Sequence, residues 1–203
     1  VASAIGGGYE VANSCRFNYG DSPRLLKSGT VAGSTTFTFS AWVKFESTTN
    51  YNFLFCDGNE VGLSKEAGAT KGALYLNGAT GGTSTNSTGL QRDFSAWYHI
   101  VVSCNSGTGI IYVNNENRKG SINIPQLADG LSIGSFFNGS SYNYYMAGYM
   151  AEVVFIDGSA LNPSSFAEYD EDSPTIWKPK DVSGLTFGTN GFHLDFEDSS
   201  ALG

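Results

Sequence analysis

The nine residues from Phe37 to Phe45, FTFSAWVKF, constrain the fold more than any other stretch of the chain. Apolar side chains recur at every second position, which places them on one face of an extended strand. The intervening Thr, Ser, Trp and Lys side chains point the other way. Such a half-buried strand packs its apolar face on a core, as in an antiparallel sheet. The segment therefore predicts a sheet protein whose strands share an apolar interior.

Short runs of the same kind follow along most of the chain, and turn pairs such as Asp57-Gly58 and Asn138-Gly139 separate them. Strands this short, with no helical period between them, are typical of a sandwich or barrel. The predicted strands are Tyr51–Cys56, Glu60–Ser64, Ala73–Asn77, Trp97–Cys104, Gly109–Asn114, Leu131–Gly134, Tyr144–Asp157 and Phe192–Phe196.

One helix is expected between Pro163 and Tyr169. Asn162 is a suitable cap, and proline is favoured at the first helical position. Acidic residues from Glu168 to Asp172 are unfavourable at a helix C-terminus, so the helix should be short. The predicted fold class is all-β, a two-sheet antiparallel β-sandwich with this one short helix.

The length of 203 residues fits one large β domain better than two small ones, so we expect a single domain over residues 1–203. The closing DFEDSSALG follows a strand without a closing element. We therefore expect the chain to be a piece of a longer polypeptide.

The charge balance excludes some classes of partner. Lys and Arg number 11 against 19 Asp and Glu, a net charge of −8. A nucleic-acid binder needs clustered cations, and so does a protein that docks on anionic lipid. We therefore expect neither nucleic acid nor an anionic membrane surface as a partner. No apolar run approaches the roughly 18 residues of a membrane helix, so no membrane insertion is expected.

The three cysteines are Cys15, Cys56 and Cys104, and their spacing matches no zinc motif. All three lie in apolar, strand-like runs. Buried thiols that pack as small hydrophobic groups are one interpretation. A disulfide between Cys56 and Cys104 is the other, and the sequence leaves both open.

The order of the strand motifs resembles a known superfamily. FTFSAWVKF is followed by WYHIVVS, GIIYVNN, LSIG and YMAEVVFIDGSALNPSSFAEY. This order is similar to that of the concanavalin A-like lectin/glucanase superfamily, in its laminin-G and pentraxin-like branch. The resemblance covers Phe37–Tyr169 and implies a lectin-type jelly roll.

A second resemblance concerns the ends of the chain. The segments AEVVFIDGSALNPSSFAEYDED, Trp177–Lys180 and Gly188–Gly203, together with Val11–Ser28, resemble a module of bacteriophage structural proteins. This implies a non-enzymatic virion component of a tail, fibre or capsid appendage, which would either adhere to host-surface glycan or hold the assembly together. Its partners would be copies of itself and other virion proteins. The alternative is a secreted, extracellular carbohydrate-binding lectin module of a cell.

No catalytic residues are predicted. Glucanases of this superfamily carry three carboxylates at alternate positions of one strand. The nearest candidates are Glu168–Asp172, at the end of the predicted helix, and Asp195–Asp198, with only two carboxylates in step. The only histidines are His99 and His193, and no G-x-S-x-G motif is present. His99 is expected to be a packing or surface residue, and the protein is not expected to be an enzyme.

No cofactor is expected, with calcium as the one metal considered. Pentraxin-like lectins bind calcium through an Asp–Asn pair after an early strand, and Asp57 and Asn59 stand at that place. The resemblance implies a second acidic cluster after Ile133-Gly134, where this chain has no carboxylate, although calcium takes six to eight oxygen ligands. The alternative is that Asp57 only forms a hairpin turn.

The most suggestive surface segment is Phe136–Tyr149, FFNGSSYNYYMAGY. Sugar rings stack on aromatic side chains, and asparagine amides pair with hydroxyls. An aromatic surface with few charges also suits a protein interface, and part of the segment could instead alternate into the core. The proposed binding residues are Phe136, Phe137, Asn138, Tyr142, Tyr144 and Tyr145.

Overall fold

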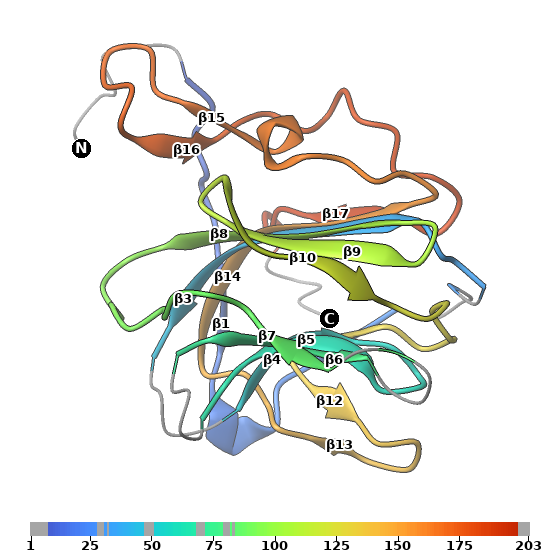
Figure 1. Cartoon of the computed structure of the whole chain (residues 1–203). Helices are drawn as coiled ribbons and strands as arrows, with labels where there is room; N and C mark the ends of the chain where they lie inside the picture. Colours follow the sequence, from blue (N-terminus) through green and yellow to red (C-terminus); the bar gives the residue numbers. More distant parts are fainter. Residues whose placement is uncertain are drawn as a thin grey trace.

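The computed structural model describes residues 8–27, 31, 33–46, 51–67, 72–78, 82 and 84–198. Two antiparallel sheets lie face to face as a sandwich (Figure 1). The first sheet has seven strands in the order β1-β14-β3-β8-β9-β10, and β17 also pairs with β14. The second sheet has six strands in the order β2-β11-β4-β5-β6-β7. The predicted fold class is confirmed.

The seven-stranded sheet consists of β1 (Cys15–Phe17), β3 (Phe37–Phe45), β8 (Tyr98–Asn105), β9 (Thr108–Val113), β10 (Glu116–Asn123), β14 (Gly148–Asp157) and β17 (Phe192–Leu194). The six-stranded sheet consists of β2 (Leu25–Leu26), β4 (Asn52–Cys56), β5 (Val61–Lys65), β6 (Leu74–Gly78), β7 (Thr85–Asn86) and β11 (Ser132–Ile133). Two small hairpins lie outside these sheets, β12 (Phe136–Phe137) with β13 (Tyr142–Asn143), and β15 (Ala167–Tyr169) with β16 (Trp177–Pro179).

The core lies between the sheets and is rich in phenylalanine. On β3 the side chains of Phe37, Phe39 and Phe45 are at most 1% exposed. Phe39 contacts Phe55 of the facing sheet at a ring separation of 4.6 Å, and Phe37 stacks on Phe155 at 5.8 Å. The apolar face of β3 therefore packs on the core, as the sequence predicts.

The other face of β3 is also buried, and the expectation of a half-buried strand is wrong. Thr38, Ser40 and Trp42 are 0%, 1% and 8% exposed. A further layer of chain covers this face, including the β15–β16 hairpin, which lies beyond the seven-stranded sheet in Figure 1. Its apolar residues, such as Phe166 and Val182, pack on Val154 and its neighbours.

The predicted helix is reduced to one 3-10 turn, η2 (Pro163–Ser165). Asn162 makes no side-chain capping hydrogen bond there. From Ala167 the chain is extended and pairs with β16, in register Ala167↔Pro179. Burying Phe166 and Ala167 on the sheet outweighs the local helix signals, since an isolated helix this short is marginal.

The three thiols are free, so the predicted alternative of a Cys56–Cys104 disulfide is wrong. Cys56 and Cys104 belong to different sheets and are fully buried. Burial raises the pKa of Cys56 to about 12 and that of Cys104 to about 11. Both thiols therefore act as small apolar groups. Among the described residues, no helix has the length and apolar character needed to cross a membrane.

Candidate functional site

The outer face of the six-stranded sheet carries an aromatic groove. Phe53 pairs with Ser64, and Ser64 pairs with Tyr75, so the three side chains form one row on one face. The alternate residues on these strands, among them Leu63 and Leu74, belong to the core. The row therefore faces outward, and the small Ser64 leaves a depression between two aromatic rings.

This depression is a hollow of about 210 Å³, which we call the aromatic groove. Its lining residues are Tyr51, Phe53, Ser64, Tyr75, Asn77, Phe136 and Tyr144. None of the seven carries a charge.

The segment after β11 builds one wall of the groove. Phe136 of β12 packs on Phe53 at a ring separation of 4.7 Å. Tyr144 lies 5.3 Å from Tyr51 and 5.8 Å from Phe136, and its carbonyl accepts a hydrogen bond from the Phe53 N–H at 3.4 Å. Tyr144 has a left-handed φ of +49° and is 47% exposed. This conformation turns the chain back over β4 and presents the Tyr144 ring to solvent.

The floor of the groove offers uncharged polar groups. Ser64 is fully buried, and within the described part of the chain its Oγ has no hydrogen-bond partner. Asn77 contributes an amide whose Oδ1 accepts a hydrogen bond from Ser84 at 3.2 Å. Tyr51, Tyr75 and Tyr144 add hydroxyl groups that both donate and accept. The groove therefore combines ring faces for stacking with polar groups for hydroxyls.

The aromatic segment singled out in the sequence divides into two groups. Only Phe136 and Tyr144 line the groove. Phe137 packs on Tyr142 at 4.9 Å, and Arg24 lies over the Tyr142 ring at 4.6 Å from its centre.

Two more of the proposed residues serve the local fold. Tyr145 donates its hydroxyl hydrogen to the Tyr142 carbonyl at 2.9 Å. Asn138 Oδ1 accepts hydrogen bonds from the backbone N–H groups of Ser140 and Ser141 at 3.1 and 2.8 Å, which closes the β12–β13 turn.

Sequence reasoning missed Tyr51, Phe53, Ser64, Tyr75 and Asn77. A signal for Tyr75 and Asn77 exists in the strand ALYLNG, where they alternate with the buried Leu74 and Leu76. That alternation marks an outward face, but the sequence does not show that β12 lies against it.

Asp57 has a structural role. Its carboxylate is fully buried and accepts hydrogen bonds from the backbone N–H groups of Asn59, Val61 and Ala128 at 2.9, 2.7 and 2.8 Å. Burial raises its pKa, and these hydrogen bonds act in the opposite direction. Asn59 contributes its backbone to this turn, and its side chain is exposed. In the described ranges no three His, Cys, Asp or Glu side chains gather as a metal site.

His99 is a packing residue, as expected. It is fully buried and stacks on Trp42 at 5.0 Å. The Trp177 Nε1–H donates to His99 Nδ1 at 3.0 Å, so the ring proton lies on Nε2, which is 2.9 Å from Ser40 Oγ. Burial lowers the pKa of His99 to about 3. The imidazole therefore stays neutral and enclosed.

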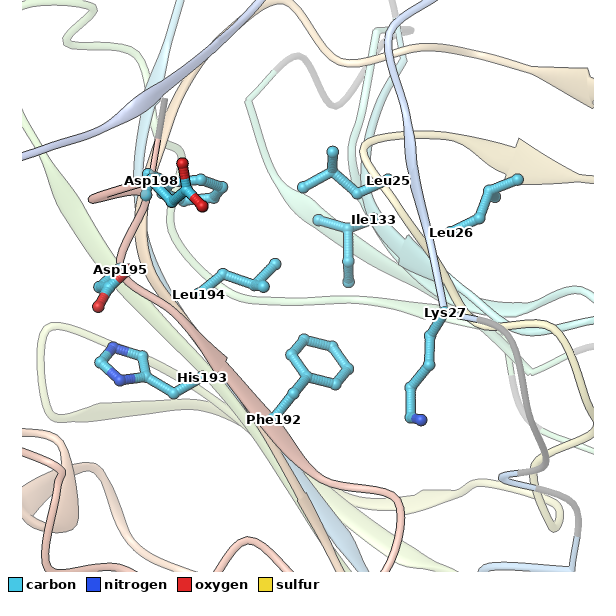
Figure 2. A pocket seen from close by; sticks show the side chains of 10 residues that line it. Leu25, Leu26, Lys27, Ile133, Phe192, His193, Leu194, Asp195 and Asp198 are labelled. Atoms are coloured by element: carbon cyan, nitrogen blue, oxygen red, sulfur yellow. The ribbon is translucent and has the colours of Figure 1, made fainter. Parts of the chain in front are cut away.

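A larger hollow of about 380 Å³ opens between the edges of the two sheets. Figure 2 shows Phe192 and Leu194 of β17 pointing toward Ile133 and Leu25, with His193 directed away. Leu25, Phe192 and Leu194 also pack against the core. This hollow is therefore the open seam of the sandwich, where the core reaches the surface.

The sequence family agrees with this architecture. Residues 18–165 match the family described as the Concanavalin A-like lectin/glucanases superfamily, and the chain belongs to it. No curated protein matches the chain.

Solved structures share the fold at low sequence identity. A crystal structure from Bacteroides ovatus, described as a candidate carbohydrate binding protein, superposes with a TM-score of 0.60 at 20% identity, over 74% of this chain and 44% of that protein. This chain thus spans less than half of that relative. The heptameric SAP-like pentraxin of Limulus polyphemus gives a TM-score of 0.59 at 14% identity, over 85% of this chain and 97% of the pentraxin.

A third similar structure is domain 4 of AbnA, an extracellular GH43 arabinanase from Geobacillus stearothermophilus, in complex with arabinotriose. It gives a TM-score of 0.51 at 19% identity, over 70% of this chain and 68% of that domain structure. At these identities the likeness establishes the fold. The protein is therefore a lectin-like β-sandwich.

Proposed function

We propose that the protein binds a neutral carbohydrate in the aromatic groove. The observation that carries this proposal is the row of Phe53, Ser64 and Tyr75, in which a small polar residue lies between aromatic rings. The superfamily and the descriptions of the Bacteroides and Geobacillus proteins support a sugar ligand. The described residues that line the groove include no carboxylate, which supports binding without hydrolysis.

The aromatic and the polar residues of the groove would contact different parts of the sugar. The exposed Tyr144 ring, with Tyr51 beside it, offers an apolar face on which the C–H groups of a sugar ring stack. Ser64 and Asn77 on the floor supply donors and acceptors for ring hydroxyls. Binding then satisfies the otherwise unpaired Ser64 hydroxyl, which favours a polar ligand over a purely apolar one.

A glycan array followed by calorimetric titration tests the proposal. Tyr144→Ala should weaken binding of the best neutral glycan at least about tenfold, or about 1.4 kcal/mol, through loss of the stacking surface. The matched control is Tyr169→Ala, because Tyr169 is 49% exposed on β15, away from the groove. Absence of binding to any glycan, or equal affinities in the two variants, would refute the groove as a sugar site.

A second proposal concerns the setting in which the domain works. The resemblance of Val11–Ser28, Trp177–Lys180 and Gly188–Gly203 to phage structural modules supports a virion appendage that adheres to host glycan. In that role the domain would be present in several copies beside other virion proteins. A secreted lectin is the competing setting. Electron microscopy of the native source distinguishes them, and a free monomer there would contradict the virion proposal.

A further inference from the structure

A third hollow, of about 290 Å³, lies on the outer face of the seven-stranded sheet, which is the opposite side of the sandwich from the aromatic groove. We call it the indole pocket. Its lining residues are Val11, Ala12, Asn13, Ser14, Trp42, Trp97, Ala151 and Pro179.

The strand register places Trp42 on the floor of this pocket. Trp42 pairs with Ala151 on one side and with His99 on the other, so the large indole lies between a small residue and a stacked imidazole. Ala151 leaves room beside the indole. The segment that precedes β1 and Pro179 at the end of β16 form the walls, and Trp97, just before β8, is 37% exposed at the rim.

The pocket has a polar group without a partner. Trp42 is only 8% exposed, and its buried Nε1–H has no hydrogen-bond partner within the described residues. A buried donor left unpaired costs on the order of 1–3 kcal/mol. By contrast, the Trp177 Nε1–H, on the same outer face, donates to His99. Trp42 is therefore a donor that an acceptor on a ligand would satisfy.

We propose that the indole pocket binds the acetamido group of an N-acetylated sugar. Such a group joins a methyl group, which suits Val11, Ala12 and the indoles, to a carbonyl oxygen that accepts the Trp42 N–H. The sugar ring attached to it stacks on the exposed Trp97. The eight lining residues are uncharged, which matches a neutral ligand.

The ligand class follows that of the proposed function, but different residues on the opposite sheet carry this second site. With the aromatic groove it would give one domain two separate sugar contacts. Weak binding at each site would then combine into avidity on a glycan-rich surface.

The test uses the whole chain labelled with ¹⁵N at its indoles and titrated with N-acetylglucosamine or glucose, which differ in the acetamido group. N-acetylglucosamine should shift the indole signals of both Trp42 and Trp97. Glucose should shift the same two signals only at concentrations at least about tenfold higher, because it binds more weakly without the acetamido group. Equal responses to both sugars, or no response at Trp42, would overturn the proposal.

Two variants separate this site from the groove. The dissociation constant of N-acetylglucosamine, followed through the Trp42 indole signal, should rise at least about tenfold in Trp97→Ala. The same constant should be unchanged in Tyr144→Ala. If Trp97→Ala does not fold, Ala12→Leu, on an exposed segment, tests the pocket by filling it. Loss of the Trp42 response in Tyr144→Ala would overturn the proposal, and failure of the groove alone would appear only on the glycan array.

Discussion

The two histidines of the chain show how strongly local surroundings decide what a residue does. Burial lowers the pKa of His99 to about 3. His193 has a raised pKa, chiefly because its Nε2 lies 2.7 Å from the Glu152 carboxylate, and burial acts in the opposite direction. Asp195 and Asp181 also favour the charged form of His193. One imidazole is thus a neutral packing group, and the other is a titratable contact.

Glu152, the partner of His193, lies at an irregular point of its strand. It lies in the irregular part of β14 between Ala151 and Val154, with a left-handed φ of +49°, and is 6% exposed. Its carboxylate also accepts the Tyr9 hydroxyl hydrogen at 3.1 Å. The bulge therefore directs one carboxylate to the N-terminal segment and to β17 together.

The Glu152–His193 pair should make stability depend on pH. Because the folded state raises the pKa of His193, the pair stabilises fully below the unfolded value of about 6.5 and loses its contribution as pH rises through the raised value. We expect the loss of unfolding free energy in His193→Gln to be larger at about pH 5.5 than at about pH 8.5. Urea denaturation of the wild-type protein and the variant at both pH values measures this loss. His99 is present in both proteins, so its own titration cancels when the two are compared. A pH-independent loss would contradict this role.

At the scale of elements, the turn between β4 and β5 is held by Asp57. Its carboxylate fixes the turn through Asn59 and Val61 and reaches Ala128, in the segment before β11. One side chain therefore supports the end of the sheet that carries the aromatic groove. A buried carboxylate with three backbone donors needs no metal ion to satisfy it.

Asp57→Asn should lower the free energy of unfolding by about 2 kcal/mol, because its amide presents a donor to a backbone N–H. Thermal melting of both proteins measures the effect. A chelator should leave the melting temperature of the wild-type protein unchanged. Calcium-dependent melting that disappears in Asp57→Asn would instead establish the pentraxin-like metal pair.

The elements most accessible from sequence were those with a clear alternation and a buried face. Strand β3 has the predicted bounds, and every other predicted strand overlaps an observed one. The strand predicted to start at Tyr144 begins at Gly148, whose φ of +138° and close approach to the Lys44 carbonyl suit glycine alone. Strand β10, ENRKGSIN, was missed because it is a polar edge strand without an apolar alternation. Its extended conformation is stabilised by pairing with β9.

The candidate site was less predictable than the fold. Phe136 and Tyr144 were found from composition, but Phe137 and Tyr142 pair with each other instead. Which aromatic ring faces the groove depends on how the β12–β13 segment folds over β4, where Tyr144 has a left-handed φ and its carbonyl accepts the Phe53 N–H. A ring's partners across sheets follow from tertiary packing, which a local pattern does not contain.

For the whole molecule, the two outer faces of the sandwich differ. The chain from η2 through β16 covers much of the seven-stranded sheet and buries Val154 and Ala167. The outer face of the six-stranded sheet carries the aromatic groove. On this face the β12–β13 segment lies over β4, and the Tyr144 ring remains 47% exposed beside the groove. An exposed ring at the edge of a hollow is where a binding surface is expected. Both proposed sugar sites have uncharged linings on a molecule whose net charge is −8.

This contrast predicts how affinity depends on salt. A neutral glycan makes no charged contact in the groove, so its dissociation constant should change less than about twofold between about 0.05 and 0.5 M NaCl. A sialylated glycan with the same neutral core should bind more weakly at low salt, because the net charge of −8 repels it, and should recover at high salt. Calorimetry with the matched glycans measures both effects. If the neutral glycan lost affinity steeply with salt, charged residues outside the groove would have to make the main contacts.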